Sequence, residues 1–208
     1  MLYPFSALLA RMKYITRWSL MHSTRAESLS EHTCDTALLA HMLCLIARRY
    51  TGTPCRPKTV AVAALYHDAP EIITGDMPTP VKYSSPTLRD AYKALETESV
   101  HCMTGLLPDE LSEELSPFIS GELLTAEEKR LLKAADRLSA LIKCMEEQRS
   151  GAWIVCNPSS IQRNLSGYSP FNFASRASTS GPRQSGLVAM EMPQTLGWLR
   201  AERYTSSR

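Results

Sequence analysis

The chain has 208 residues, of which 44% are hydrophobic and 21% charged, and its formal net charge at pH 7 is +2. This length and balance suit one globular domain with a sizeable core. The small net charge gives no support for a nucleic-acid partner. No stretch reaches the roughly 18 consecutive apolar residues that a membrane-spanning helix needs. We therefore expect a globular protein that binds neither nucleic acid nor membrane.

Apolar residues recur at helical spacing along most of the chain, and no alternating strand-like series recurs, which predicts an all-α fold. Two capping boxes of the form S/T-x-x-E begin at Ser28 and Thr125 and predict helix starts. Pro70 ends a nearly all-apolar helix, which we expect to be the most buried one, and leaves Glu71 to open the next turn. The predicted helices cover about residues 4–15, 29–50, 58–69, 86–106, 108–118 and 125–149.

The N-terminal stretch "MLYPFSALLARMKYITRW" is predicted to be a helix and not a secretion signal. Arg11 and Lys13 interrupt its apolar run, and no small-residue cleavage site follows. The six Cys residues form no C-x-x-C pair, which excludes a zinc ribbon or a thioredoxin-like motif. Their irregular spacing favours reduced thiols in a cytoplasmic protein.

The composition changes near Gly151 and divides the chain into a core, 1–150, and a C-terminal segment, 151–208. The segment contains six Arg, two Glu and ten Ser residues but no Lys and no Asp. Its weak periodicity and scattered Pro and Gly predict an irregular tail that is partly disordered. A short terminal helix is expected in "LVAMEM…TLGWL".

Four polar residues on apolar helical stripes are candidate metal ligands: His32, His67, Asp68 and Asp136. Charged groups on a buried stripe cost free energy unless they are paired or bind a metal. Three helices of a bundle can bring such residues to one point. Two imidazoles and two carboxylates suit Mn, Co, Fe, Ni or Zn better than Ca or Mg.

Each candidate ligand also has an ordinary structural interpretation. A single His on an amphipathic helix is commonly a hydrogen-bonded core residue or a surface residue. Asp136 has Lys133 and Arg137 nearby as possible ion-pair partners. The adjacent pair His67-Asp68 inside an apolar run, and the ordered set of four, favour the metal site.

Four segments together resemble the bacterial 5′-deoxynucleotidase family of the HD-domain metal-dependent phosphohydrolases. They are "RW" at 17–18, "SEH" at 30–32, "YHDAPEIITGDMPTPVKY" at 66–83 and "EEKRLLKAADRLSALIKCMEE" at 127–147. The resemblance covers about residues 1–150. It implies an all-α HD-domain helical bundle, usually a homodimer, that hydrolyses deoxyribonucleoside 5′-monophosphates to deoxyribonucleosides and phosphate.

The resemblance also implies a role for particular residues. The divalent metal, Co, Mn or a similar transition metal, would be bound by His32, His67, Asp68 and Asp136. Glu71 would be the catalytic carboxylate, as acid or as base. Substrate contacts would come from Arg17 and Trp18, from the ligands His32, Asp68 and Asp136, and from a nucleotide-pocket segment, Asp76, Met77, Pro78 and Thr79. Trp18 would help to orient the phosphate.

The residues alone leave simpler alternatives open for these positions. Arg17 could be a solvated surface charge, and Trp18 could be a core aromatic. The segment "TGDMPTP" could be a plain loop, because Gly, Asp and Pro are ordinary turn residues. Glu71 could be an N-terminal helix carboxylate that the helix dipole favours.

The C-terminal segment, 151–208, departs from the family pattern, which continues there with charged helix-forming sequence. A reading-frame change near codon 151 and lineage-specific divergence are the two explanations. All candidate site residues precede this point, so the site can still assemble. The alternative functions are an HD-domain hydrolase of another nucleotide, or a catalytically weakened module that binds metal or nucleotide.

Overall fold

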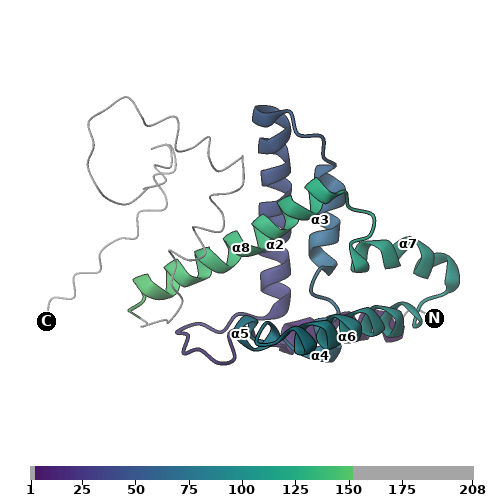
Figure 1. The fold of residues 1–208 in the computed structure, drawn as a ribbon, viewed down its shortest axis with the longest axis horizontal. Helices are drawn as coiled ribbons and strands as arrows, with labels where there is room; N and C mark the ends of the chain where they lie inside the picture. The colour runs from purple at the N-terminus through teal and green to yellow at the C-terminus, as the bar shows by residue number, and fades with distance from the viewer. Residues whose placement is uncertain (1–2, 152–208) are drawn as a thin grey trace, which may run out of the picture. The chain divides into compact units, whose positions relative to one another are not determined.

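The computed structural model describes residues 3–151, which form helices joined by short loops (Figure 1). The elements are α1 (Tyr3–Leu9), the 3-10 turn η1 (Ala10–Tyr14), α2 (Leu29–Ile46), the π-helical turn η2 (Ala47–Thr51), α3 (Pro57–Tyr66), α4 (Glu71–Thr74), α5 (Thr79–Lys82), α6 (Pro86–Thr104), α7 (Asp109–Ser120) and α8 (Ala126–Arg149). Within this range no strand forms, and extended pairing is limited to an isolated bridge between Thr16 and Ser28. The predicted all-α class is confirmed; the predicted tail lies outside the described residues.

Helix boundaries follow local sequence chemistry closely. Both predicted capping boxes form, so that α2 begins after Ser28 and α8 after Thr125. Helix α3 has Pro57 at its first position and ends before Pro70, which caps the short α4. One expectation needs correction, because the C-terminal part of the predicted "TGDMPTP" loop starts the helix α5 at Thr79.

Helices α2, α3 and α8 form one hydrophobic core. Figure 1 shows α8 crossing α2, with α3 beside α2, and the contacts between these elements agree. Small side chains dominate where the helices meet and allow a close approach of their axes. The buried residues of this core are Ala37, Ala40, Leu43, Cys44, Ala47, Val60, Ala63, Ala64, Leu124, Leu131, Ala134 and Ala135.

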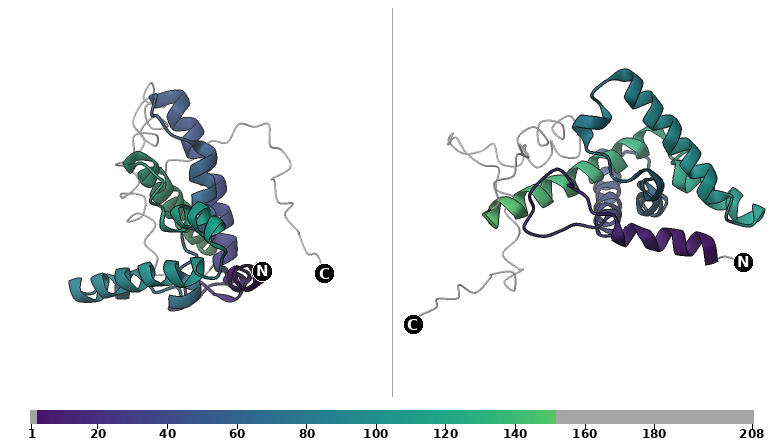
Figure 2. Two further views of the ribbon diagram at one scale, coloured as in Figure 1. Left: turned by 90° about the vertical axis from the view of Figure 1, so that its right-hand side faces the viewer. Right: turned by 90° about the horizontal axis from the view of Figure 1, so that it is seen from below.

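A second core surrounds α6. This helix contacts α1, α4, α5 and α7, and the turned views in Figure 2 show one of its ends near α1. The buried residues of this second core are Phe5, Met12, Leu29, Ala69, Ile72, Val100, Met103, Leu107 and Ile119. Leu29 begins α2 and Ala69 follows α3, so the second core covers the ends of two helices that belong to the first.

Helix α3 is less buried than its apolar sequence predicts. Val60, Ala63 and Ala64 are buried, but Val62 and Leu65 are 38% and 43% exposed. The helix therefore packs on one side, against α2, α7 and α8. The expectation that it is the most buried helix is wrong, because its neighbours cover only that side.

Two buried carboxylates tie distant segments to α8. Glu128 accepts hydrogen bonds from the backbone N–H, Nε and Nη2 of Arg56, at 2.8, 2.9 and 2.6 Å, and so anchors the start of α3. Glu147 accepts from the backbone and hydroxyl of Thr24, at 2.6 and 2.7 Å, and pairs with Lys143. These contacts hold α3 and the 15–28 connector against the same helix.

Two further expectations concern the cysteines and membrane spans. Cys34, Cys44, Cys55 and Cys102 are free thiols, as predicted. In the described part of the chain, no helix combines the length and the apolar character that crossing a bilayer requires.

We predict that Glu128→Ala lowers the free energy of unfolding by about 2–4 kcal/mol, because it removes a helix cap and several charge-assisted hydrogen bonds. The Arg56 contacts lower the pKa of Glu128 from 4.5 to about 2. The stabilisation that the ionised Glu128 gives to the folded state is therefore complete above pH 4.5 and is lost as the pH falls towards 2. Urea unfolding at several pH values measures both effects.

The matched control is Glu127→Ala, which removes a neighbouring, half-exposed carboxylate that pairs only with Arg130. An exposed pair of this kind contributes at most about 1 kcal/mol. Equal effects of the two substitutions at neutral pH would contradict the anchoring role of Glu128.

Candidate functional site

The ends of two helices and the middle of a third carry the candidate ligands. The capping box at Ser28 places His32 one turn into α2. Helix α3 ends at Tyr66, and the turn before Pro70 carries His67 and Asp68. Asp136 lies in the middle of α8. The local sequence thus determines the position of each candidate ligand along its helix or turn, and the packing of the three helices brings the ligands together.

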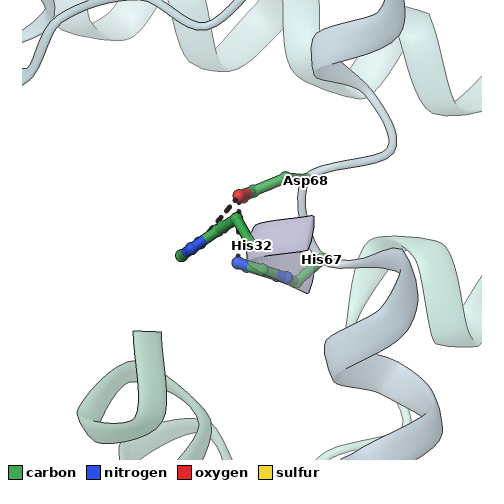
Figure 3. Close-up of side chains that lie close together, drawn as sticks. All are labelled: His32, His67 and Asp68. Atoms are coloured by element: carbon green, nitrogen blue, oxygen red, sulfur yellow. Dashed lines mark ion pairs between the residues drawn. The ribbon is translucent and has the colours of Figure 1, made fainter. Parts of the chain in front are cut away.

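His32, His67 and Asp68 form a compact cluster. Oδ2 of Asp68 lies 3.4 Å from Nε2 of His32 and 3.1 Å from Nε2 of His67. One potential ligand atom from each residue lies within 4.8 Å of the other two. Figure 3 shows the Asp68 carboxylate facing both imidazoles. The structure therefore brings three of the four predicted ligands to one place.

Neighbouring groups fix the orientation of both imidazoles. Nδ1 of His67 donates a hydrogen bond to the carbonyl oxygen of Ala64 at 2.7 Å, which leaves Nε2 facing the cluster. Nδ1 of His32 lies 3.3 Å from the hydroxyl of Ser139 on α8. Among the described residues, the buried Nε2 of His67 makes no well-aligned hydrogen bond. A buried donor set of this kind fits a divalent metal ion.

Asp136 approaches the cluster from the side of His32. Its Oδ1 lies 3.3 Å from Nε2 of His32, and its Oδ2 accepts from Nζ of Lys133 at 2.6 Å. Both interpretations of this residue are therefore present in the structure, since it pairs with Lys133 and also faces the cluster. It does not belong to the mutually close trio of ligand atoms.

Electrostatics at the cluster favour a cation. Burial lowers the pKa of His67, but the charge and hydrogen bonding of Asp68 outweigh it and raise this pKa to about 9. Burial also opposes ionisation of Asp68 and Asp136, yet the neighbouring His and Lys groups hold the pKa of each below its usual range. A proton on His67 thus balances carboxylate charge, a task that a bound metal can take over.

The connector before α2 brings Arg17 to the cluster, while the indole of Trp18 faces Glu27. Nη1 of Arg17 lies 3.4 Å from Oδ2 of Asp68, and only 13% of the Arg17 side chain is exposed. Trp18 has φ 63°, the only positive φ of a non-glycine residue in the described chain. This backbone conformation costs about 1–2 kcal/mol for a residue with a Cβ. Arg17 is therefore not the solvated surface charge of the simpler alternative.

Glu71 opens α4 beside the cluster, as the sequence predicted. Its Oε2 is buried and has no hydrogen-bond partner among the described residues. Burial, followed by the charges of Asp68 and Asp76, raises the pKa of Glu71 to about 8, while Arg17 and Lys82 oppose the shift. A carboxyl group poised in this way can exchange a proton near neutral pH.

The predicted pocket segment, 76–79, follows a glycine turn. Gly75 adopts φ 75° and ψ 160°, a conformation that side chains disfavour. Asp76, Met77 and Pro78 are partly buried, while Thr79 is exposed. Burial raises the pKa of Asp76, although Arg17 opposes that shift. Asp76 therefore lies within the electrostatic reach of the residues at the cluster.

Several supporting residues escaped the sequence analysis. Tyr92 of α6 donates to the carbonyl of Gly75 at 3.1 Å. Ser139 orients His32, and Glu27 contacts both Arg17 and Trp18. The Ser139 and His32 positions are 107 residues apart. No local pattern links residues at such separations, so only the folded structure could identify these partners.

An all-α fold with His32, His67-Asp68 and Asp136 at one site defines an HD-domain phosphohydrolase. Solved structures share this fold. An HD-domain phosphohydrolase from Listeria innocua matches with a TM-score of 0.64 at 20% identity, over 85% of this chain and 81% of that chain. A cyanophage S-2L HD phosphohydrolase (DatZ), bound to dA and one catalytic Zn²⁺ ion, has a TM-score of 0.51 at 22% identity, over 82% and 95%.

The chain belongs to the YfbR-like 5′-deoxynucleotidase family, whose model matches residues 4–154. It is 42% identical over 147 residues to a 5′-deoxynucleotidase of Vibrio parahaemolyticus, which covers 71% of this chain and 76% of the relative. The 5′-deoxynucleotidase YfbR of Escherichia coli is also 42% identical, over 71% and 74%. The expected family is thus confirmed, and the chain is a hydrolase of the HD type.

We predict that Mn²⁺ at about 100 times its Kd raises the free energy of unfolding by about 2.7 kcal/mol, and that Asp68→Ala abolishes this gain. The substitution removes the oxygen that faces both imidazoles. Chemical unfolding with and without Mn²⁺ measures the gain. Asp90→Ala, which removes an exposed carboxylate on α6, should retain it. An undiminished gain in Asp68→Ala would contradict the site.

Proposed function

We propose that this protein hydrolyses deoxyribonucleoside 5′-monophosphates to deoxyribonucleosides and phosphate, with the help of a divalent metal ion. The observation that carries the proposal is the convergence of His32, His67 and Asp68 with Arg17 at one buried site. Membership of the YfbR-like family, whose named relatives are 5′-deoxynucleotidases, supports this substrate class.

The metal would be held by His32, His67 and Asp68, with Asp136 completing the set from α8. The mixed nitrogen and oxygen donors favour Mn, Co or a similar transition metal. A bound metal ion supplies positive charge against the phosphate oxygens and acidifies water at neutral pH. The Nδ1 contacts of His67 and His32 hold the imidazoles in place for this purpose.

Arg17 and Trp18 would bind the phosphate beside the ligands. A phosphomonoester is a dianion that repels nucleophiles, and the planar guanidinium of Arg17 can contact two of its oxygens at once. The 3.4 Å separation between Arg17 and Asp68 brings this positive group to the edge of the cluster. His32, Asp68 and Asp136 would contact the substrate from the side of the metal.

Glu71 would be the catalytic carboxylate. Its buried Oε2, which has no hydrogen-bond partner within residues 3–151, belongs to the first turn after the His67-Asp68 pair. The carboxyl group could accept a proton from the attacking water or donate one to the leaving 5′-oxygen. Either transfer needs a pKa near the working pH, and the surroundings of Glu71 raise its pKa from the usual acidic range.

The segment 76–79 would line the pocket for the nucleoside. Asp76 can accept a hydrogen bond from the 3′-hydroxyl of the sugar, with Met77, Pro78 and Thr79 beside it. Preference for deoxyribose needs a wall that crowds the 2′ position, because a hydrophobic pocket alone rejects an added hydroxyl weakly. The Tyr92 hydrogen bond to Gly75 holds the start of this segment against α6.

We predict that the full-length protein with Mn²⁺ or Co²⁺ releases phosphate from deoxyribonucleoside 5′-monophosphates in preference to ribonucleotides. Glu71→Gln should lower the turnover number at least about 100-fold, because a proton-transfer group is lost. The same variant should keep its metal-dependent stabilisation. Glu98→Gln, an exposed change on α6, is the matched control and should keep full activity.

A panel with triphosphates, cyclic dinucleotides and alarmones separates the alternative hydrolases. If the protein hydrolysed only one of these nucleotide classes, that class would be its substrate in place of the deoxyribonucleoside 5′-monophosphates. A metal-stabilised protein that turns over no nucleotide would favour the weakened binding module.

We further propose a cytoplasmic homodimer with a core of 1–150 and an atypical segment of 151–208. Leu38, Met42 and Leu45 are 67%, 55% and 40% exposed along one face of α2. Acidic Glu31 and Asp35 lie on the first turns of the same helix, and Arg48 and Arg49 follow its end. Two antiparallel copies can therefore bury the apolar stripe and bring opposite charges together.

We predict that light scattering after size-exclusion chromatography gives the mass of a dimer, and that Met42→Glu gives a monomer. The control Lys93→Glu changes an exposed residue on α6 and should remain dimeric. A wild-type monomer, or a dimer that survives Met42→Glu, would contradict the proposed α2 interface.

A further inference from the structure

Glu27 is a buried carboxylate for which neither the sequence motifs nor the proposed chemistry gives a role. The residue is only 9% exposed, although it lies in the polar connector that precedes α2. A buried carboxylate of this kind needs partners that compensate for its lost hydration. The partners here are the two residues proposed to bind the phosphate.

The side chains of Arg17 and Trp18 both face the same oxygen of Glu27. Nε1 of Trp18 donates to Oε2 at 2.5 Å, and Nε of Arg17 lies 3.4 Å from that atom. Among the described residues, Nε of Arg17 makes no well-aligned hydrogen bond. The carboxylate thus attracts the guanidinium by charge, while Nη1 of Arg17 donates a hydrogen bond to Oδ2 of Asp68 at 3.4 Å.

The backbone around Trp18 is arranged for this contact. The N–H of Arg17 donates to the carbonyl of Glu27 at 2.9 Å, and the N–H of Met21 donates to that of Trp18 at 2.8 Å. These bonds close a tight loop and hold Trp18 in its left-handed conformation. In this conformation, Arg17 and Trp18 can both face Glu27 although they are adjacent in sequence.

The guanidinium of Arg17 lies between two carboxylates, Glu27 and Asp68, each at 3.4 Å. Asp68 is also the residue whose oxygen faces both imidazoles. Without the charge of Glu27, Arg17 is left with carboxylates on the side of the cluster: Asp68, which accepts its hydrogen bond, and Glu71 and Asp76, whose charges also act on it. Movement towards Asp68 would withdraw the guanidinium from the phosphate and compete with the metal for the same oxygen.

We propose that Glu27 is a positioning residue that holds Arg17 and Trp18 in their phosphate-binding orientation and keeps Arg17 from closing onto Asp68. The inference rests on the proposed phosphomonoesterase function. It assigns Glu27 no contact with the substrate, because the residue acts through its two neighbours.

Glu27→Gln tests the charge alone, because the amide oxygen can still accept the hydrogen bond from Trp18. We expect KM for a deoxyribonucleoside 5′-monophosphate to rise about tenfold, with kcat within about twofold, since one oriented charge contact is lost. Asp90→Asn, which removes an exposed negative charge from α6, should leave both parameters unchanged. Equal KM values for wild type and Glu27→Gln would overturn the proposal.

A double-mutant cycle separates positioning from general structural damage. If Glu27 acts through Arg17, Glu27→Gln should have little further effect on KM once Arg17 is already Ala. Full additivity of the two substitutions would overturn the proposal, even if each variant were impaired alone.

Failure of the proposed activity has a separate signature. If the wild-type protein hydrolyses no nucleotide, calorimetric titration of the Mn²⁺-loaded protein with inorganic phosphate replaces kinetics as the measurement. Weaker phosphate binding by Glu27→Gln than by Asp90→Asn still supports the positioning role. Indistinguishable binding by the two variants, or no binding by the wild type, overturns it.

Discussion

The negative charge of Asp68 is the constraint on which the site depends. Its carboxylate is largely withdrawn from water, and one oxygen faces His32, His67 and Arg17 at 3.4, 3.1 and 3.4 Å. The partners come from α2, from the turn after α3 and from the connector before α2. If any of these segments moved, the buried carboxylate of Asp68 would lose a compensating partner. Leaving a buried charge with no partner at all costs several kcal/mol. The tertiary arrangement and the chemistry of the site are therefore coupled.

The helical framework satisfies this constraint by fixing the ends of helices. A capping box starts α2 one turn before His32. Pro70 separates α3 from α4, so that His67 and Asp68 both lie in the turn between these helices. Glu128 then joins the start of α3 to α8, the helix that carries Asp136. Alanine-rich contacts in the first core let these helices approach closely. Stability and site geometry consequently share the same contacts.

A site of this kind handles a phosphate monoester by balancing opposite charges over a short distance. Carboxylates and imidazoles suit a transition metal, and Arg17 adds a fixed positive charge beside them. Glu71 lies among carboxylates that oppose its ionisation, so that it can exchange a proton near neutral pH. The left-handed Trp18 shows that some backbone strain is retained in this region, where Glu27 and the neighbouring backbone hydrogen bonds maintain it.

The sequence by itself determined the features that depend on near neighbours. The capping boxes, the break at Pro70 and the pairing of Asp136 with Lys133 all involve residues within about one helical turn. Polar residues on apolar helical stripes indicated the candidate ligands, and the family resemblance added the catalytic role of Glu71. Only the tertiary structure could reveal Glu27 as the partner of Arg17 and Trp18, Ser139 as the partner of His32, or Tyr92 as the anchor of Gly75. Those contacts join side chains from separate segments, and their formation depends on how the helices pack, which no local pattern records.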